Sequence, residues 1–210
     1  MARQYILMAD VISSRTFAPK GLAAQFAEVV AHINKRFKKD LLSPLTITLG
    51  DEFQGVAAHL PAAVEVLIAM EEAIVTRGLP FQLRYVLYYG SIETPVNTMK
   101  AHGMLGAGLT AARQQLGALK KKKRLRFHIE TGKALRDSLH NETFFIFQSL
   151  TDGWHPRDSA LLEAFLHWGD YRKVAEALNK DVSLVWRREK TLRIREYIAA
   201  RAVLRQLTQL

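Results

Sequence analysis

Three carboxylates in the first quarter of the chain are the residues best suited to chemistry. Asp10 ends a short apolar run, Gln4–Ala9, and small polar residues follow it. Asp51 and Glu52 lie between two short runs that favour β-structure. Carboxylate oxygens are the ligands that Mg²⁺ or Mn²⁺ prefers, and an ion held this way can bind phosphates. Asp10, Asp51 and Glu52 are therefore candidate metal ligands.

A hairpin and a buried strand must position these side chains. Leu45–Val56 contains two extended runs joined at Gly50, a residue that suits a turn with positive φ. The apolar run before Asp10 predicts a buried strand that delivers its carboxylate to the edge of a sheet. The alternative for the hairpin is that Gly50 and Asp51 form only a turn.

Small polar and basic residues near the carboxylates are candidate nucleotide contacts. They are Ser13, Ser14 and Arg15 in the loop after the first acid, and Gly50 in the hairpin. The segment Gly21–Lys38 has the apolar spacing of a helix that packs on the sheet, and helix N-termini favour anions. For Arg15 the alternative is a solvated arginine.

The next segments continue the alternation of helix and strand. Pro61–Arg77 has the apolar stripe and the end signals of a helix, and Phe81–Tyr89 has the composition of a strand. Arg84 is the one charge in that strand, so it lies at the rim of the sheet or pairs with an acid, for which Asp10, Asp51 and Glu52 are the candidates. A glycine-rich segment then precedes an expected helix at Leu109–Leu116.

These motifs resemble those of nucleotidyl cyclases. Ala9–Ser14 (ADVISS) is similar to the end of the first strand of class III cyclases, and Leu49–Phe53 (LGDEF) to their Gly-Asp hairpin and to the GGDEF hairpin of diguanylate cyclases. Leu83–Ile92 resembles the cyclase strand that comes next, and Met104–Leu116 the helix after it. With helices added at its C-terminus, the whole chain looks most like the SatD family, a small bacterial family.

The resemblance implies an α/β (α+β) fold, a ferredoxin-like cyclase palm with an antiparallel-containing sheet, and binding of metal and nucleotide. Arg113 falls where cyclases place an arginine that stabilises the transition state, so it is the candidate catalytic residue if the protein is an enzyme. The alternative for Arg113 is a solvated helix arginine. Three cyclase residues have no match: Ile47 replaces the lysine that binds adenine, Leu109 replaces an asparagine, and the strand histidine is absent at 87–89.

Near residue 152 the strand signals end, and the pattern of the remaining residues is that of helices. We predict a palm domain over 1–152 and a helical domain over 153–210, with helices at Arg157–Trp168, at Tyr171–Leu178 and from Ser183 onward.

The last two of these helices fit a helix-turn-helix. Asn179 suits the turn and Ser183 suits the cap of the second helix. The residues expected to contact DNA are Ser183, Trp186, Arg187, Arg188, Lys190 and Arg193. Arg188 stands where this motif usually has an apolar residue. Either Trp186 or Leu192 packs inward in its place, or the helices form only a structural bundle.

Charge and composition indicate which partners and which cellular location to expect. The net charge of +10 and the pI near 9.9 favour polyanionic partners. The basic run Lys120–Arg124 is either an exposed turn or a phosphate site. The chain has no cysteine, no apolar run long enough to span a bilayer and no signal-peptide pattern, so we expect a cytoplasmic protein with no membrane partner.

The interpretation that these features favour is a DNA-binding regulatory protein whose cyclase-like domain binds a nucleotide, a divalent metal, or both. One alternative is a metal-dependent nucleotidyl-transfer or cyclase-type enzyme acting on a nucleoside triphosphate, and another is a basic protein-interaction module. The final helix, with Ile194, Tyr197, Ile198 and Val203, is expected to support a homodimer.

Overall fold

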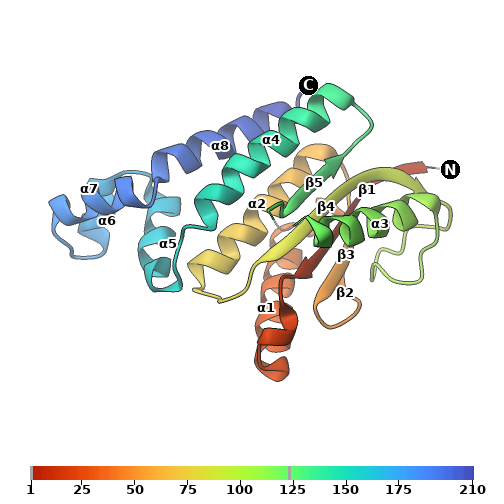
Figure 1. The fold of residues 1–210 in the computed structure, drawn as a ribbon, viewed down its shortest axis with the longest axis horizontal. Coiled ribbons are helices and arrows are strands. Elements are labelled where there is room, and N and C mark those ends of the chain that lie inside the picture. The colour runs from red at the N-terminus through yellow and green to blue at the C-terminus, as the bar shows by residue number, and fades with distance from the viewer. Residues whose placement is uncertain (1, 123) are drawn as a thin grey trace.

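A five-stranded mixed sheet with helices on both faces, followed by a helical C-terminal region, forms the protein (Figure 1). The computed structural model describes residues 2–122 and 124–210. The strands are β1 (Ala2–Val11), β2 (Leu41–Ile47), β3 (Glu52–Ala57), β4 (Leu83–Ile92) and β5 (Phe127–Glu130). The helices are α1 (Pro19–Arg36), α2 (Leu60–Thr76), α3 (Ala107–Lys121), α4 (Ala134–Thr151), α5 (Ser159–Trp168), α6 (Tyr171–Ala177), α7 (Val182–Thr191) and α8 (Ile194–Leu207), with 3₁₀ turns at Ser14–Thr16 and Pro156–Asp158.

The strand order places β1 at the centre of the sheet. The order is β2-β3-β1-β4-β5, with antiparallel neighbours except for the parallel pair β4 and β5. The first four strands with α1 and α2 form a split β-α-β arrangement, in which β3 lies between β1 and β2. The predicted sheet with antiparallel pairs is confirmed. Because β1 has a neighbour on each side, the residues near its end face side chains from both β3 and β4.

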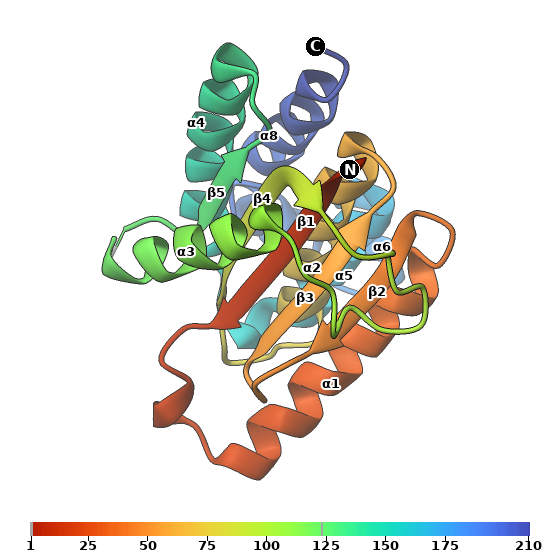
Figure 2. The same ribbon diagram turned by 90° about the vertical axis from the view of Figure 1, so that its right-hand side faces the viewer.

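Alternation along β1 builds two apolar layers. Leu7, Ala9 and Val11 belong to the core with α1 and α2, whereas Ile6 and Met8 belong to the core with α3. When both faces of a strand are buried, consecutive side chains are all apolar, which explains the composition of this segment. Figure 2 shows α3 in front of β4 on the face turned toward the viewer, and the helix also contacts β1.

The C-terminal helices pack against the helices of the sheet. Helix α8 lies along α4 (Figure 1), and the Tyr197 ring lies between Phe147 and Trp154, with centroid distances of 5.2 and 4.7 Å. Trp154 Nε1 also donates to the Leu192 carbonyl at 2.8 Å. The apolar face that we expected to support a dimer is thus largely covered within the chain. Dimerisation stays a prediction, and Val203, 42% exposed, is left at the surface.

The acidic face of α2 meets a basic face of α8. Glu72 accepts from Tyr197 Oη at 2.9 Å and from Arg201 Nη1 at 2.6 Å, and Glu65 pairs with Arg205 one helical turn further along α8. Glu65 and Glu72 are seven residues apart and therefore share one face of α2. These pairs hold α8 against α2.

The helix predicted from Ser183 onward is two helices. Helix α7 ends at Thr191, and Arg193 adopts a left-handed conformation with φ of 55° before α8 begins. Leu192 and Ile194 are both buried. In one continuous helix two residues this close in sequence would point in widely different directions, so the break lets both reach the core.

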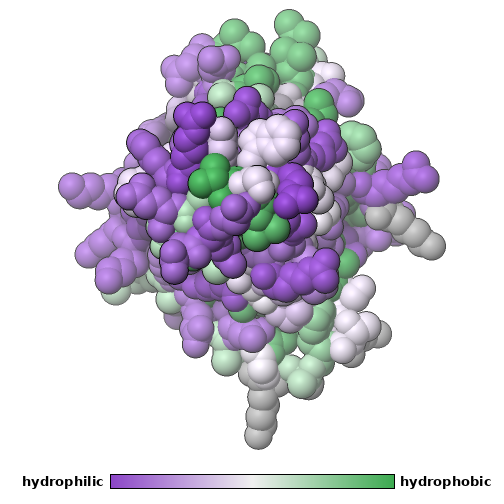
Figure 3. All heavy atoms as spheres, turned by 90° about the vertical axis from the view of Figure 1, so that its left-hand side faces the viewer, coloured by the Kyte–Doolittle hydropathy of each residue, from purple (hydrophilic) through white to green (hydrophobic). Residues whose placement is uncertain are grey.

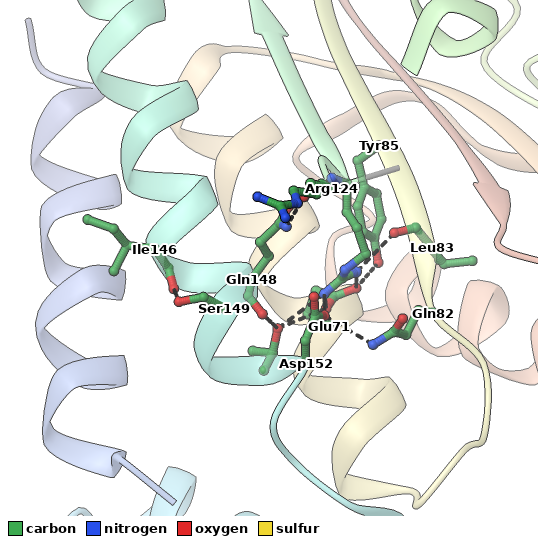
Figure 4. Close-up of polar contacts among 11 residues, drawn as sticks. Glu71, Gln82, Leu83, Tyr85, Arg124, Ile146, Gln148, Ser149 and Asp152 are labelled. Atoms are coloured by element: carbon green, nitrogen blue, oxygen red, sulfur yellow. Dashed lines mark hydrogen bonds and ion pairs between the residues drawn. The ribbon is translucent and has the colours of Figure 1, made fainter. Parts of the chain in front are cut away.

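A buried ion pair joins the edge of the sheet to α2 and to the end of α4 (Figure 4). Arg126, 5% exposed, donates to both Glu71 oxygens at 2.6 and 3.0 Å and lies 2.8 Å from Asp152 Oδ1. Tyr85 Oη donates to Glu71 Oε1 at 2.7 Å. The pair therefore links α2, β4, the start of β5 and the segment that leads into the helical region.

We predict that Glu71→Ala lowers the free energy of unfolding by about 3–5 kcal/mol, because it leaves the Arg126 charge buried without its bidentate partner. Urea denaturation measures the change. The matched control is Glu142→Ala on the exposed face of α4, which should stay within about 0.5 kcal/mol of the wild type. Equal losses in the two variants would contradict this account of the pair.

Candidate functional site

Asp10 lies near the carboxyl end of β1, on the face covered by α3. It stands directly opposite Glu52 of β3 and Arg84 of β4 in the strand register. Arg84 Nη1 is 2.9 Å from Asp10 Oδ2, so the charge predicted in the fourth strand does pair with a carboxylate. The Asp10 residue is only 3% exposed. A buried carboxylate and its partners thus meet at the centre of the sheet.

Helix α3 adds two cations to this point. Lys120 Nζ is 3.0 Å from Glu52 Oε1 and 3.2 Å from Asp10 Oδ2, and Arg113 Nη1 is 3.5 Å from Glu52 Oε2. Arg113 and Lys120 are seven residues apart, so both lie on the same stripe of the helix. We call Asp10, Glu52, Arg84, Arg113 and Lys120 the charge cluster. The first residue of the predicted basic run therefore belongs to this cluster rather than to an exposed turn, while Lys123 lies outside the described residues.

Two glycines allow α3 to approach the sheet closely. A Cβ atom at Gly90 would lie 2.6 Å from Gly108 Cα, a distance that only glycine avoids without movement of the backbone. This contact places the first turn of α3 on β4. Leu109 is buried against the sheet at this point.

A groove of about 500 Å³ opens beside the charge cluster. It lies between the β2–β3 hairpin, the segment 101–105 and the first half of α3, and its polar lining includes Thr48, Gln54, His102, Thr110 and Arg113. Thr48 Oγ1 is buried, and within 2–122 and 124–210 it has no hydrogen-bond partner. Arg113 faces both the groove and Glu52. The groove therefore offers a polar, partly cationic site for a ligand.

Burial and pairing shift two pKa values in the cluster. Burial raises the pKa of Asp10 above its usual value, and this effect outweighs the opposing charges of Lys120 and Arg84. Partial burial lowers the pKa of Lys120, but hydrogen bonds and charge from Glu52 and Asp10 outweigh it, so the pKa lies above its usual value. The pKa of Asp10 rises because its carboxylate is taken out of water, and the pKa of Lys120 rises because its ammonium lies between two carboxylates.

The described side chains do not fit a two-metal site. Among them, no group of three or more His, Asp or Glu residues is placed to hold a metal ion. Asp10 Oδ2 and Glu52 Oε1 both face Lys120, and three cations surround the two carboxylates. Mg²⁺ or Mn²⁺ binding at Asp10, Asp51 and Glu52 stays a prediction from the sequence.

The other predicted contacts are divided between two places. Gly50 has φ of 81° in the hairpin turn, and the Asp51 carbonyl accepts from Val11 N at 2.9 Å. Ser13 lines a separate cavity of about 280 Å³ beside Arg126, and Ser14 begins the adjoining 3₁₀ turn. The side chain of Arg15 lies outside the described part of the structure. The structure therefore brings Asp10, Glu52 and Arg113 together and leaves Ser13 apart from them.

Sequence reasoning missed Lys120, Thr48 and Gln54 as members of this site. Gln54 lies two residues after Glu52 on the same face of β3, and strand periodicity could have found it. Lys120 follows Arg113 by two helical turns, which would have been informative had the helix been predicted at its full length.

The candidate DNA contacts lie on α7. Ser183, Trp186, Arg187 and Lys190 are exposed along one face, and Lys190 Nζ lies 3.7 Å from the centroid of the Trp186 ring. Seen from the end that carries α6 and α7, the surface is mostly hydrophilic around a small hydrophobic patch (Figure 3). Arg193 is exposed at the break after α7 and lies 3.8 Å from Glu196.

Two details of α7 differ from expectation. Asp181 caps the helix by accepting from Leu184 N at 2.9 Å, whereas Ser183 donates to Asp181, so the predicted Ser183 cap is wrong. Val185 and Leu192 pack inward while Trp186 is 40% exposed, which decides between the two predicted phases of the helix. Arg188 is half-buried because it pairs with Asp158 beside α5.

Comparison with known proteins identifies the family. The family model described as the SatD family matches residues 5–208. The chain belongs to the SatD family. No curated protein matches this SatD-family chain.

Solved structures that are similar to it include a bacterial light-regulated adenylyl cyclase, at 12% identity and a TM-score of 0.42, covering 60% of this chain and 74% of that one. Another is the catalytic core of a rhodopsin-guanylyl cyclase with converted specificity in complex with ATPαS, at 17% identity and a TM-score of 0.40, covering 55% and 71%. In the ranges that the structure describes, no helix has both the length and the apolar character needed to cross a membrane.

Because the pKa of Asp10 is raised, we predict how the free energy of unfolding depends on pH. The folded protein holds the Asp10 proton more tightly than the unfolded chain, so this contribution is present at low pH and is lost as pH rises from about 4 through the folded-state pKa. The free energy of unfolding of the wild type minus that of Asp10→Asn should fall over this range. Urea denaturation at a series of pH values measures the difference. A difference that rises with pH would show that pairing outweighs burial at Asp10.

Proposed function

We propose that this SatD-family protein is a DNA-binding regulatory protein whose sheet domain binds a phosphate-bearing ligand, such as a nucleotide. The observation that carries the proposal is the exposed face of α7, which presents Trp186, Arg187 and Lys190 side by side with Ser183. Cations contact phosphates, and a polar or aromatic residue beside them contacts sugars and base edges.

The geometry around α7 supports a helix-turn-helix. Helices α6 and α7 are joined by a short turn in which Asn179 has φ of 49°, the left-handed conformation predicted for it. Val174, Ala175 and Val185 are buried between the two helices and the core. The pair of Arg188 with Asp158 holds α7 to the segment before α5, which leaves its opposite face for the major groove.

The groove beside the charge cluster supports the ligand-binding half of the proposal. It has a size suited to a small molecule and combines hydroxyl, amide and guanidinium groups with an unpaired Thr48 hydroxyl in the described ranges. Arg113 stands between the groove and the cluster, where a phosphate would exchange the partial contact with Glu52 for a closer one. Arg113 is thus a binding residue in this proposal. Catalysis remains the alternative function, and it would need carboxylates that are free of their present cations.

Binding of labelled duplexes to the protein tests the DNA proposal. Fluorescence anisotropy is measured over a salt titration with DNA from upstream of the protein's own gene and with a scrambled duplex of equal length. We predict that Arg187→Ala/Lys190→Ala weakens binding at every salt concentration. The slope of log affinity against log salt should become shallower by roughly two, because two phosphate contacts are lost.

The matched control removes two cations from another surface. Lys38→Ala/Lys39→Ala changes exposed lysines in the turn between α1 and β2 and should leave the slope near that of the wild type. If the wild type fails to bind at low salt, or if both double variants lose the same affinity, the α7 face is not a DNA-binding surface.

A further inference from the structure

The position of Lys120 between two acids suggests a role that neither DNA binding nor the groove requires. Its Nζ lies 3.0 Å from Glu52 Oε1 and 3.2 Å from Asp10 Oδ2, so one ammonium bridges two carboxylates from neighbouring strands. A divalent ion shared by two carboxylates would occupy the space between the same oxygens. An ammonium and a metal ion cannot both be there.

The rest of the cluster strengthens this arrangement. Arg84 holds Asp10 from the β4 side at 2.9 Å, and Arg113 lies 3.5 Å from the second Glu52 oxygen. Three positive side chains therefore surround two negative ones. A divalent cation that approached the pair would meet repulsion from all three, and it would have to displace a lysine whose bonds to both acids are already formed.

We propose that Lys120 is a resident cation that takes the place of a divalent metal in this domain and makes the carboxylate pair unable to bind Mg²⁺ or Mn²⁺. The strand register places Asp10 opposite Glu52, so two acids lie side by side at the centre of the sheet. Lys120 of the same chain neutralises their charge. The raised pKa of Lys120 agrees with this role, since the lysine stays charged beside the acids.

Asp10 has a second carboxylate oxygen that would be available to a cation if Lys120 were removed. Asp10 Oδ1 is buried and, within the residues that the structure describes, accepts no hydrogen bond. Loss of the lysine would leave this oxygen, Asp10 Oδ2 and Glu52 Oε1 near a space that a cation can enter. The wild-type lysine is then a residue that determines which cation the site accepts.

Binding of Mn²⁺ alone, followed through the electron paramagnetic resonance signal of the free ion, tests the proposal without DNA or nucleotide. The wild type should bind Mn²⁺ no more tightly than Glu52→Gln, because the carboxylate pair does not contribute to binding. Lys120→Met should bind Mn²⁺ about tenfold or more tightly than the wild type, since one nearby positive charge is gone. Adding Glu52→Gln to Lys120→Met should remove this gain.

The control is Lys121→Met, which removes the same charge from the next, exposed residue of α3 and should leave Mn²⁺ binding unchanged. Circular dichroism establishes that each variant is folded. The proposal is overturned if the wild type binds Mn²⁺ and loses it in Glu52→Gln, or if a folded Lys120→Met gains no affinity. The comparison of the wild type with Glu52→Gln can still overturn the proposal if Lys120→Met does not fold.

Discussion

The buried ion pair between Glu71 and Arg126 is the interaction on which the arrangement of the whole molecule depends. Removing two charges from water is costly, and it is offset here by two bonds between guanidinium and carboxylate, by Tyr85 and by Asp152. Because Asp152 follows the last residue of α4, the same arginine ties the edge of the sheet to the end of α4. The next residue of α2, Glu72, turns toward α8 and holds it. Adjacent acids on one helix thus fix the sheet edge and the C-terminal helix.

In the charge cluster on the other face of the sheet, a buried carboxylate likewise requires cations close to it. Asp10 is as buried as Glu71, and it too is compensated by side chains from separate elements, Arg84 of β4 and Lys120 of α3. The close contact of Gly90 with Gly108 brings α3 near enough for this to happen. In our account the cations that neutralise the cluster belong to the protein. Arg113, whose contact with Glu52 is the longest of the cluster at 3.5 Å, also faces the groove, where it would meet the negative charge of a ligand.

Local pattern predicted most elements, because amphipathic spacing and turn residues act over short stretches of chain. It also predicted that Asp10 and the hairpin acids approach each other. It did not predict Lys120, since five basic residues in a row look the same in sequence whether they are solvated or paired across the sheet. Pairing of that kind depends on strand register and helix length, which are set by distant contacts. The break at Arg193 was missed for a related reason: the burial of both Leu192 and Ile194 requires it, whereas arginine gives no local signal for a left-handed residue.

Thermal unfolding of the wild-type protein with ATP, GTP or a cyclic dinucleotide, each with and without Mn²⁺, tests most directly whether the sheet domain binds phosphates through its own cations. A ligand at one hundred times its Kd should add about 2.7 kcal/mol to the free energy of unfolding. Our account predicts that at least one nucleotide stabilises the protein, and that Mn²⁺ does not change the effect. Stabilisation that appears only with Mn²⁺ would contradict it, and so would the absence of stabilisation by every nucleotide.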